Sequence, residues 1–334
     1  MKALERGWYR MAAVLVFAAF GIVTTIATGG GGGGGDTIAP PPGTTGPTLA
    51  ITVANGEDVC AATVTGIMML FDVSEISDPL VLSADDAMPA LLKVGSGEAG
   101  SEVPFSGIVE PCAAGGTITL SGDVADPNTL TVGDTITAVF DNCDENDGYV
   151  IDGELELIVA AINGDPLTDV FLITLDMQLT NLVVSDASGG ATADGDMTLT
   201  LDTLDFPVIA TALSGDELQL SEAGLSVTFQ NYDHTLEIDT GLVPQTVLAE
   251  VFGRIGGNAL GGTVDYETVT PIQATGDNPP YVGEILITGA DDSQVRIVIV
   301  NEKLVRLEID EDGDGVVDEF IDTTWSALEG DTTG

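Results

Sequence analysis

The sequence predicts a mainly β protein: a long antiparallel meander forming a curved sheet, a sandwich or a partly closed barrel, with one N-terminal amphipathic helix packed on it. Two observations support this fold class. After residue 48, Leu, Ile and Val mostly alternate with Thr, Asp and Glu, so each strand has one apolar and one polar face. Asp-Gly, Ser-Gly and Gly-Gly pairs separate the alternating stretches, as is typical of hairpin turns.

The alternation locates the expected strands in order along the chain. We expect them at residues 115–124, 134–143, 153–162, 170–179, 196–206, 216–223, 224–239, 284–289, 293–300, 304–309 and 316–325. The glycine-rich stretch 256–263 is interpreted as a loop or a kinked strand.

One segment departs from this period and predicts a helix over about residues 56–72. Its apolar positions recur at helical spacing and form a single face, made by Cys60, Val64, Ile67, Met68 and Phe71. An amphipathic helix needs another surface to bury that face. We therefore expect it to cover one end or one face of the β body.

The N-terminus predicts an export signal at residues 1–27. Three basic residues precede an uncharged apolar stretch, and Thr25-Ile26-Ala27 gives a small-x-small pattern at its end. The alternative is an uncleaved segment that anchors the chain in the membrane. Either way, we expect the folded part to be periplasmic or extracellular.

The remaining chain divides into three parts. Residues 28–47 are rich in glycine and proline and predict a flexible linker. Residues 48–328 predict a single β-rich domain, and residues 329–334 a disordered tail.

The leader resembles the start of many Gram-negative lipoproteins, in which apolar residues, a small residue and a run of glycines follow one another. In those proteins a lipid-modified Cys precedes the glycines, whereas this chain has Thr28. Residues 110–160, with "CAAGGTITLSGDV" and "GDTITAVFDNC", and residues 283–328 resemble uncharacterised Gram-negative envelope proteins. This resemblance implies an envelope location and supplies no activity.

The three cysteines predict one disulfide. In an oxidising compartment Cys112 and Cys143, at the ends of adjacent expected strands, can face each other. Their bond would close a loop of about 30 residues and contribute about 3–4 kcal/mol in the chain-entropy description. Cys60 lies on the apolar helical face and is interpreted as a small buried side chain. Because no CxxC pair occurs, zinc binding has no support.

The charge balance excludes two classes of partner. The chain has 8 Lys and Arg against 54 Asp and Glu, a net charge of −46. Nucleic acids and anionic membrane surfaces need basic residues to neutralise their phosphates. Cations are the natural counterpart, and solubility in a salty medium is the alternative reason for the charge.

The sequence carries no motif for nucleophilic catalysis. His234 is the single histidine and lies in an expected strand without a Ser or Cys motif beside it, so it is interpreted as an ordinary sheet residue. We therefore expect no enzymatic activity and no catalytic residues. A hydrolase that uses a pair of acids remains a third alternative.

The acidic stretch "IDEDGDGVVDEF", residues 309–320, is the strongest candidate site. Its spacing resembles the calcium loops of EF-hand, dockerin and thrombospondin-type modules, with ligands expected from Asp310, Asp312, Asp314, the carbonyl of Val316, and Asp318. Position 12 of such a loop, counted from Asp310, usually holds a bidentate acid, whereas this chain has Ile321 there. The alternative is an Asp-Gly turn with solvated charges. The related acidic hairpin at residues 141–154 is interpreted as a turn.

These features lead to two main functional hypotheses. The first is a non-enzymatic envelope or exported protein with a structural or adhesive role and a weak calcium site in its C-terminal hairpin. The second is a periplasmic carrier of a lipid or other apolar ligand.

Overall fold

The computed structural model describes residues 46–70, 103–125, 130–144, 149–164, 170–185, 189–222, 224–276 and 278–328. The expected signal peptide, nearly all of the expected linker and the expected tail lie outside these residues.

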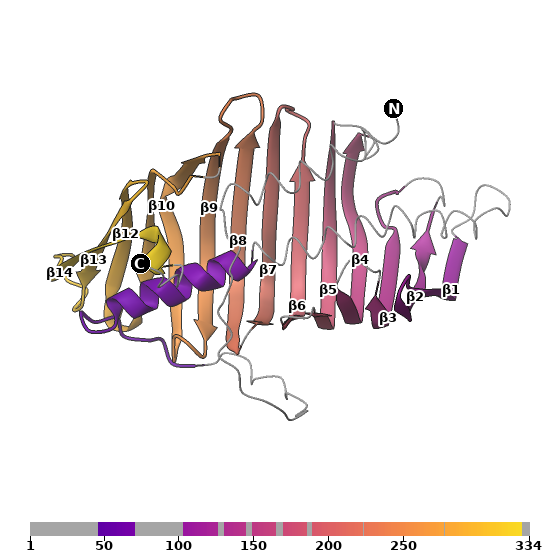
Figure 1. Cartoon of the computed structure of the whole chain (residues 1–334), viewed down its shortest axis with the longest axis horizontal. Helices are drawn as coiled ribbons and strands as arrows, with labels where there is room; N and C mark the ends of the chain where they lie inside the picture. Colours follow the sequence, from indigo (N-terminus) through magenta and orange to yellow (C-terminus); the bar gives the residue numbers. More distant parts are fainter. Residues whose placement is uncertain are drawn as a thin grey trace.

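Fourteen antiparallel strands form one sheet in which each strand pairs with its neighbours in sequence (Figure 1). The strands are β1 Val103–Pro111, β2 Gly115–Val124, β3 Thr135–Asp144, β4 Val150–Gly164, β5 Phe171–Ser185, β6 Gly190–Asp202, β7 Val208–Glu222, β8 Leu225–Asp239, β9 Thr246–Gly257, β10 Thr263–Thr275, β11 Val282–Thr288, β12 Gln294–Asn301, β13 Leu304–Asp310 and β14 Glu319–Thr323. The expected mainly antiparallel β architecture is confirmed.

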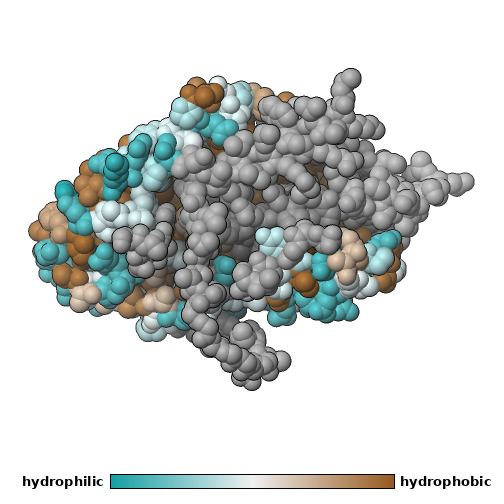
Figure 2. All heavy atoms as spheres, in the orientation of Figure 1, coloured by the Kyte–Doolittle hydropathy of each residue, from teal (hydrophilic) through white to brown (hydrophobic). Residues whose placement is uncertain are grey.

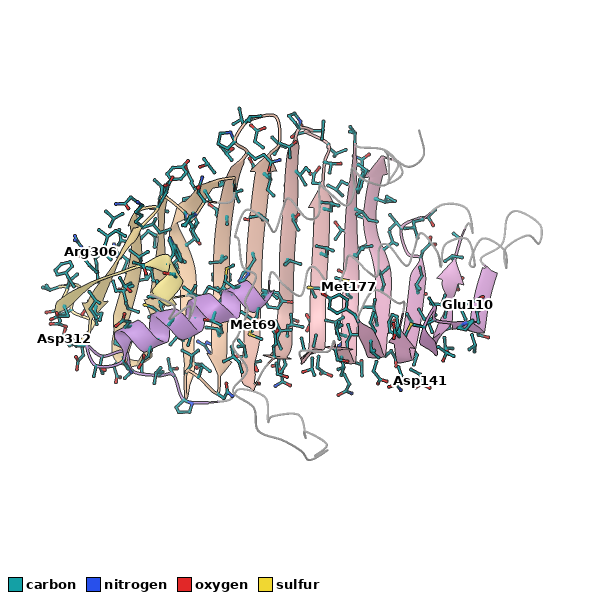
Figure 3. All side chains as sticks on the ribbon, viewed as in Figure 1. Met69, Glu110, Asp141, Met177, Arg306 and Asp312 are labelled. Atoms are coloured by element: carbon teal, nitrogen blue, oxygen red, sulfur yellow. A yellow bond between two sulfur atoms is a disulfide. The ribbon has the colours of Figure 1, made fainter. Side chains whose placement is uncertain are left out.

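The sheet is open, with β1 and β14 as its two edges. Glu110 of β1 and Asp312, beyond β13, lie at opposite ends of the long axis (Figure 3). Partial closure into a barrel, one of the three expected arrangements, is absent from the described residues because β1 and β14 do not pair there.

One face of the sheet carries the core. In β8, for example, exposed Asp233, Thr235 and Glu237 alternate with buried Tyr232, His234, Leu236 and Ile238. Burial of such a face provides most of the stabilisation of a sheet, at about 25 cal/mol per Å² of apolar surface. At the end formed by the later strands, hydrophilic and hydrophobic residues are interspersed on the surface (Figure 2).

Bulges make several strands longer than expected. Asn142, Asn181 and Asn231 have φ of 49°, 46° and 47°, and each lies where a ladder shifts register. A bulge inserts one residue and reverses which side chains face inward. The period-two pattern therefore breaks within β5, whose expected end is residue 179 and whose observed end is Ser185.

Three strands, β1, β9 and β10, were not expected as strands. The expected loop at 256–263 is the connection between β9 and β10, together with the first residue of β10 and the last two of β9. The strand expected at 196–206 ends at Asp202 in the structure, and a turn with a cis Phe206–Pro207 bond follows.

A helix occupies residues 56–70 and crosses the apolar face from β13 towards β8 (Figure 1). Glycines allow its close approach: a Cβ on Gly56 would lie 2.6 Å from Cδ1 of Ile309, and one on Gly66 would lie 2.5 Å from Cδ1 of Ile255. Within the described residues, no helix is long and apolar enough to cross a membrane.

The buried face of this helix differs in part from the expected one. Its buried residues include Val59, Cys60, Thr63, Val64, Gly66, Ile67 and Leu70. Met68 is only half-buried. The buried face of the helix includes Gly56 and Gly66, and Met68 lies at the edge of that face. Residues 71 and 72 lie outside the described residues.

Candidate metal site

The loop between β13 and β14 is organised by one buried carboxylate. Asp310, at the end of β13, is 6% exposed. Its Oδ1 accepts a hydrogen bond from the N–H of Gly313 and its Oδ2 one from the N–H of Gly315, both at 2.8 Å. These glycines have φ of 71° and 84°, a region that other residues occupy at a cost. The sequence Asp-x-x-Gly-x-Gly therefore folds the chain tightly around Asp310.

Three expected ligands are brought together by this turn. Oxygens of Asp310, Asp312 and Asp314 lie within 4.8 Å of one another. Asp312 and Asp314 are exposed and also accept local hydrogen bonds, from the N–H groups of Asp314 at 3.3 Å and Val316 at 2.8 Å. Like charges at this separation repel one another, and a bound cation would remove that repulsion.

The other two expected ligands are placed differently. Asp318 does not belong to the group of three carboxylates. Its Oδ2 accepts a 2.8 Å hydrogen bond from the N–H of Glu311, and its own N–H donates to the carbonyl of Ile309 at 2.7 Å. Asp318 therefore closes the base of the loop. Val316 is 64% exposed at the tip, and Ile321 pairs with Leu307 within the β13–β14 ladder.

The loop contacts two segments that the sequence did not indicate as its neighbours. The N–H of Val53, just before the helix, donates a 3.1 Å hydrogen bond to Oε2 of Glu311. Gly313 lies against the carbonyl of Asp292, in the turn between β11 and β12. Asp291 and Asp292 have φ of 56° and 60°. The expected strands at 284–289 and 293–300 leave a turn at this place, but nothing in the sequence indicates its contact with the acidic loop.

The donor set fits a hard cation. All three grouped side chains are carboxylates, which suit calcium or magnesium and not soft metals. Calcium accepts six to eight oxygens in a flexible arrangement. A site with three protein carboxylates at an exposed loop leaves the remaining positions to water, which suits weak binding.

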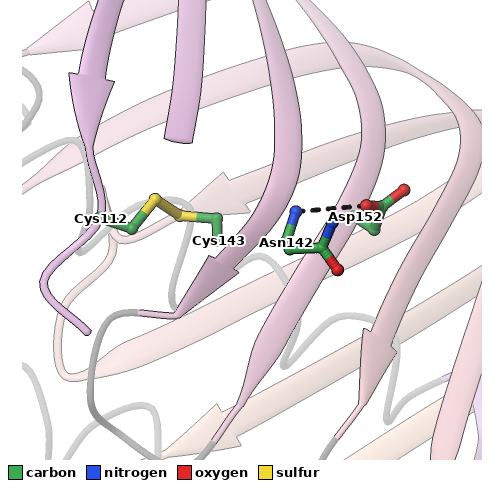
Figure 4. The surroundings of a disulfide bond; sticks show 4 residues. All are labelled: Cys112, Asn142, Cys143 and Asp152. Carbon is green, nitrogen blue, oxygen red and sulfur yellow. Dashed lines mark hydrogen bonds between the residues drawn. A yellow bond between two sulfur atoms is a disulfide. The ribbon is translucent and has the colours of Figure 1, made fainter. Parts of the chain in front are cut away.

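The expected disulfide is present at the other end of the sheet. Cys112 and Cys143 are bonded, with their Cα atoms 5.4 Å apart (Figure 4). The bond joins the β1–β2 turn to the end of β3. Beside it, the N–H of Asn142 in the bulge donates a 3.2 Å hydrogen bond to Asp152 of β4. Asn146 and Gly148 of the related acidic hairpin lie outside the described residues.

His234 lies within a buried aromatic cluster. It is 1% exposed, and its Nε2 lies 2.7 Å from the hydroxyl of Tyr266. Burial lowers the pKa of His234 from 6.5 to about 3, because the imidazolium would lose its hydration. His234 is therefore neutral at ordinary pH. Burial also raises the pKa of the Cys60 thiol, which keeps that side chain protonated and unreactive.

No protein-family model, curated protein sequence or solved structure matches this chain. The geometry of its own residues is therefore the basis for assigning a function.

Proposed function

We propose that the protein is a non-enzymatic, exported component of the cell envelope with a structural role, in which calcium bound by the β13–β14 loop stabilises the C-terminal end of the sheet. The observation that carries this proposal is the convergence of Asp310, Asp312 and Asp314 within 4.8 Å. The resemblance of the leader and of two internal stretches to envelope proteins supports the location.

The position of the loop gives the cation a structural task. An open sheet has two edges, and edge strands are the first to fray because they pair on one side only. The β13–β14 loop contacts both the segment before the helix and the β11–β12 turn. A cation that rigidified this loop would hold three segments together at that edge.

The disulfide has the corresponding place at the opposite edge. It ties the turn after β1 to β3. The acidic loop lies at the opposite edge of the sheet and cannot stabilise this one. A protein fastened at both edges of a single sheet suits a load-bearing or adhesive role outside the cell. Its net charge of −46 also makes its stability sensitive to cations.

The two other hypotheses have less support from the described residues. One groove formed by the described residues is open, has charged and amide side chains in its lining, and lies on the face opposite the core. An apolar carrier would need an enclosed apolar cavity. An acid-pair hydrolase would need a groove with two carboxylates about 5–10 Å apart and aromatics beside them. Asp265 and Glu267 line the groove beside Phe252, but Asp265 is held in an ion pair by Arg254, so it is not free to act as an acid or a base.

Calcium titration monitored by thermal unfolding tests the proposal. Millimolar calcium should raise the Tm of the chelator-treated protein, with an apparent affinity in the range of about 0.1–1 mM. The double variant Asp312→Asn, Asp314→Asn keeps the oxygens that accept the loop hydrogen bonds and removes two charges. It should fold and lose the calcium-dependent rise in Tm.

A matched control separates binding at the loop from general screening. Asp233→Asn with Glu237→Gln removes two exposed charges from β8 and should retain the full calcium response. If both double variants respond alike, or if the parent protein shows no rise in Tm beyond that given by an equal ionic strength of sodium chloride, the calcium site is refuted.

A further inference from the structure

A second site is indicated where the regular pairing of β9 with β10 is interrupted. Their ladder pairs Val264 with Ile255 and resumes where Ile272 pairs with Ala249. Between these points, residues 265–271 face residues 250–254 without regular pairing. The N–H of Val251 donates instead to Oγ1 of Thr268, at 2.9 Å.

The irregularity extends into the neighbouring ladders at the same level. The β8–β9 pairing shifts between Gln230 and Asp233, where Asn231 has a positive φ. The β10–β11 pairing shifts twice after Thr268. A gap in a central ladder forfeits backbone hydrogen bonds, and such irregularities are frequent beside functional sites.

Beside this interruption lies a groove of about 410 Å³, on the face of the sheet opposite the core. Four strands contribute to it, and its polar and aromatic lining includes Gln230, Phe252, Arg254, Asp265, Glu267 and Thr288. Phe252 is 54% exposed, so its ring is accessible to a molecule in the groove. Buried Tyr266 also lines the groove.

The polar side chains are held in fixed positions around Phe252. Arg254 and Asp265 form a bidentate pair across the gap, with Nε–Oδ1 and Nη2–Oδ2 distances of 2.7 and 3.0 Å. The groove therefore presents an aromatic surface, guanidinium hydrogen-bond donors and carboxylate acceptors. Its amide and hydroxyl groups can both donate and accept hydrogen bonds.

The charge of the lining disfavours anions. Asp265 neutralises Arg254, which is the one basic residue among the described residues that line the groove, and Glu267 adds a negative charge. A neutral polyhydroxylated molecule fits this set best: its apolar C–H face can pack on Phe252, and each hydroxyl can both donate and accept.

We propose that this groove binds a neutral oligosaccharide. The sugar ring packs against Phe252, and its hydroxyl groups bond to the Arg254–Asp265 pair and to Glu267. The site lies apart from the calcium loop and does not depend on it. For a protein exported to the envelope, it supplies an attachment to glycan.

The chain contains a natural control for this site. Phe320 on β14 is 56% exposed and lies near Arg306, which pairs with Asp322 at 2.9 Å. This is the same set of side chains on a ladder that pairs continuously from Val305 to Ile309. Phe320 lies on an edge strand and does not line the groove.

Ligand-observed saturation-transfer NMR on the full chain tests the proposal with cellohexaose, maltohexaose and chitohexaose. At least one should bind saturably. Phe252→Ala and Glu267→Ala should each weaken binding about tenfold, whereas Phe320→Ala should change it less than about twofold. Because Phe252 and Phe320 are both more than half exposed, the Tm of each variant should stay close to that of the parent.

Three results would overturn the proposal. One is the absence of saturable binding by all three sugars up to their solubility. Another is an equal loss of affinity in Phe252→Ala and Phe320→Ala, which would indicate general aromatic contact. The third is binding of hexalysine, abolished by salt, in place of the sugars, which would make the groove a site for cationic ligands.

Discussion

Gly313 packs directly against the carbonyl of Asp292: a Cβ at Gly313 would lie 2.8 Å from that oxygen. This contact joins the acidic loop after β13 to the turn between β11 and β12. The two turns are separated in sequence by strand β12 and strand β13.

Replacement of Gly313 should therefore destabilise the protein. Gly313→Ala combines a positive φ with this collision and should lower the free energy of unfolding by about 1–3 kcal/mol. Gly315 also has a positive φ, of 84°, but a Cβ at Gly315 would have nothing within 4 Å. Gly315→Ala should cost less in urea-induced unfolding, and an equal cost for the two variants would contradict the role of the Asp292 contact.

Loss of the disulfide should weaken the β1 edge. The double variant Cys112→Ala, Cys143→Ala should lose about 2–4 kcal/mol, with faster hydrogen exchange in β1–β3 and little change in β11–β13. A reductant should lower the Tm of the parent protein but leave that of the double variant unchanged. Cys60→Ala, which removes a buried thiol that is not bonded to another cysteine, should keep the sensitivity to reductant.

The stability should decrease in mild acid because of His234. Its pKa is about 3 in the folded protein against 6.5 ordinarily, so the unfolded chain binds a proton at pH values where the folded protein does not. The free energy of unfolding therefore decreases as pH falls from above 6.5 towards 3. Between pH 7 and 5 this contribution amounts to about 2 kcal/mol.

His234→Gln isolates that contribution, because Gln can still bond to the hydroxyl of Tyr266 and does not titrate. Urea unfolding at pH 7 and pH 5 should show a smaller loss of stability in the variant than in the parent. The carboxylates titrate in both proteins and cancel in the comparison. Identical losses would mean that the pKa of His234 does not change on folding.

Docking of the helix should depend on Gly66. Ala has a higher helix propensity than Gly, by about 1 kcal/mol, yet a Cβ at Gly66 would lie 2.5 Å from Cδ1 of Ile255. Gly66→Ala should therefore destabilise the protein. Adding Ile255→Val removes the Cδ1 atom and should recover much of the loss. A double-mutant cycle without a coupling energy would show that the helix does not pack there.

The alternation of apolar and polar residues was sufficient to locate strands whose pairing is regular. β2 begins and ends where alternation predicts, β8 differs from the expected bounds by one residue at its start, and β12 by one residue at each end. β9 was missed because its outward positions include Leu248 and Phe252, so apolar and polar residues do not alternate in its sequence although buried and exposed positions do. β10 was missed because its irregular ladder with β9 releases its residues from strict alternation. The same release explains why Phe252 and Arg254 were not recognised as neighbours of Asp265.

The residue pattern was enough to predict the antiparallel β class, the Cys112–Cys143 pair and the spacing of Asp310, Asp312 and Asp314, because all three depend on residues close together along the chain or on a single repeated period. Three features are evident only in the folded chain: the sheet stays open, Asp318 closes the loop instead of joining the carboxylates, and Asp292 and Val53 meet that loop. These features depend on how bulges shift register and how distant turns pack, and such long-range contacts leave no periodic trace in a single sequence.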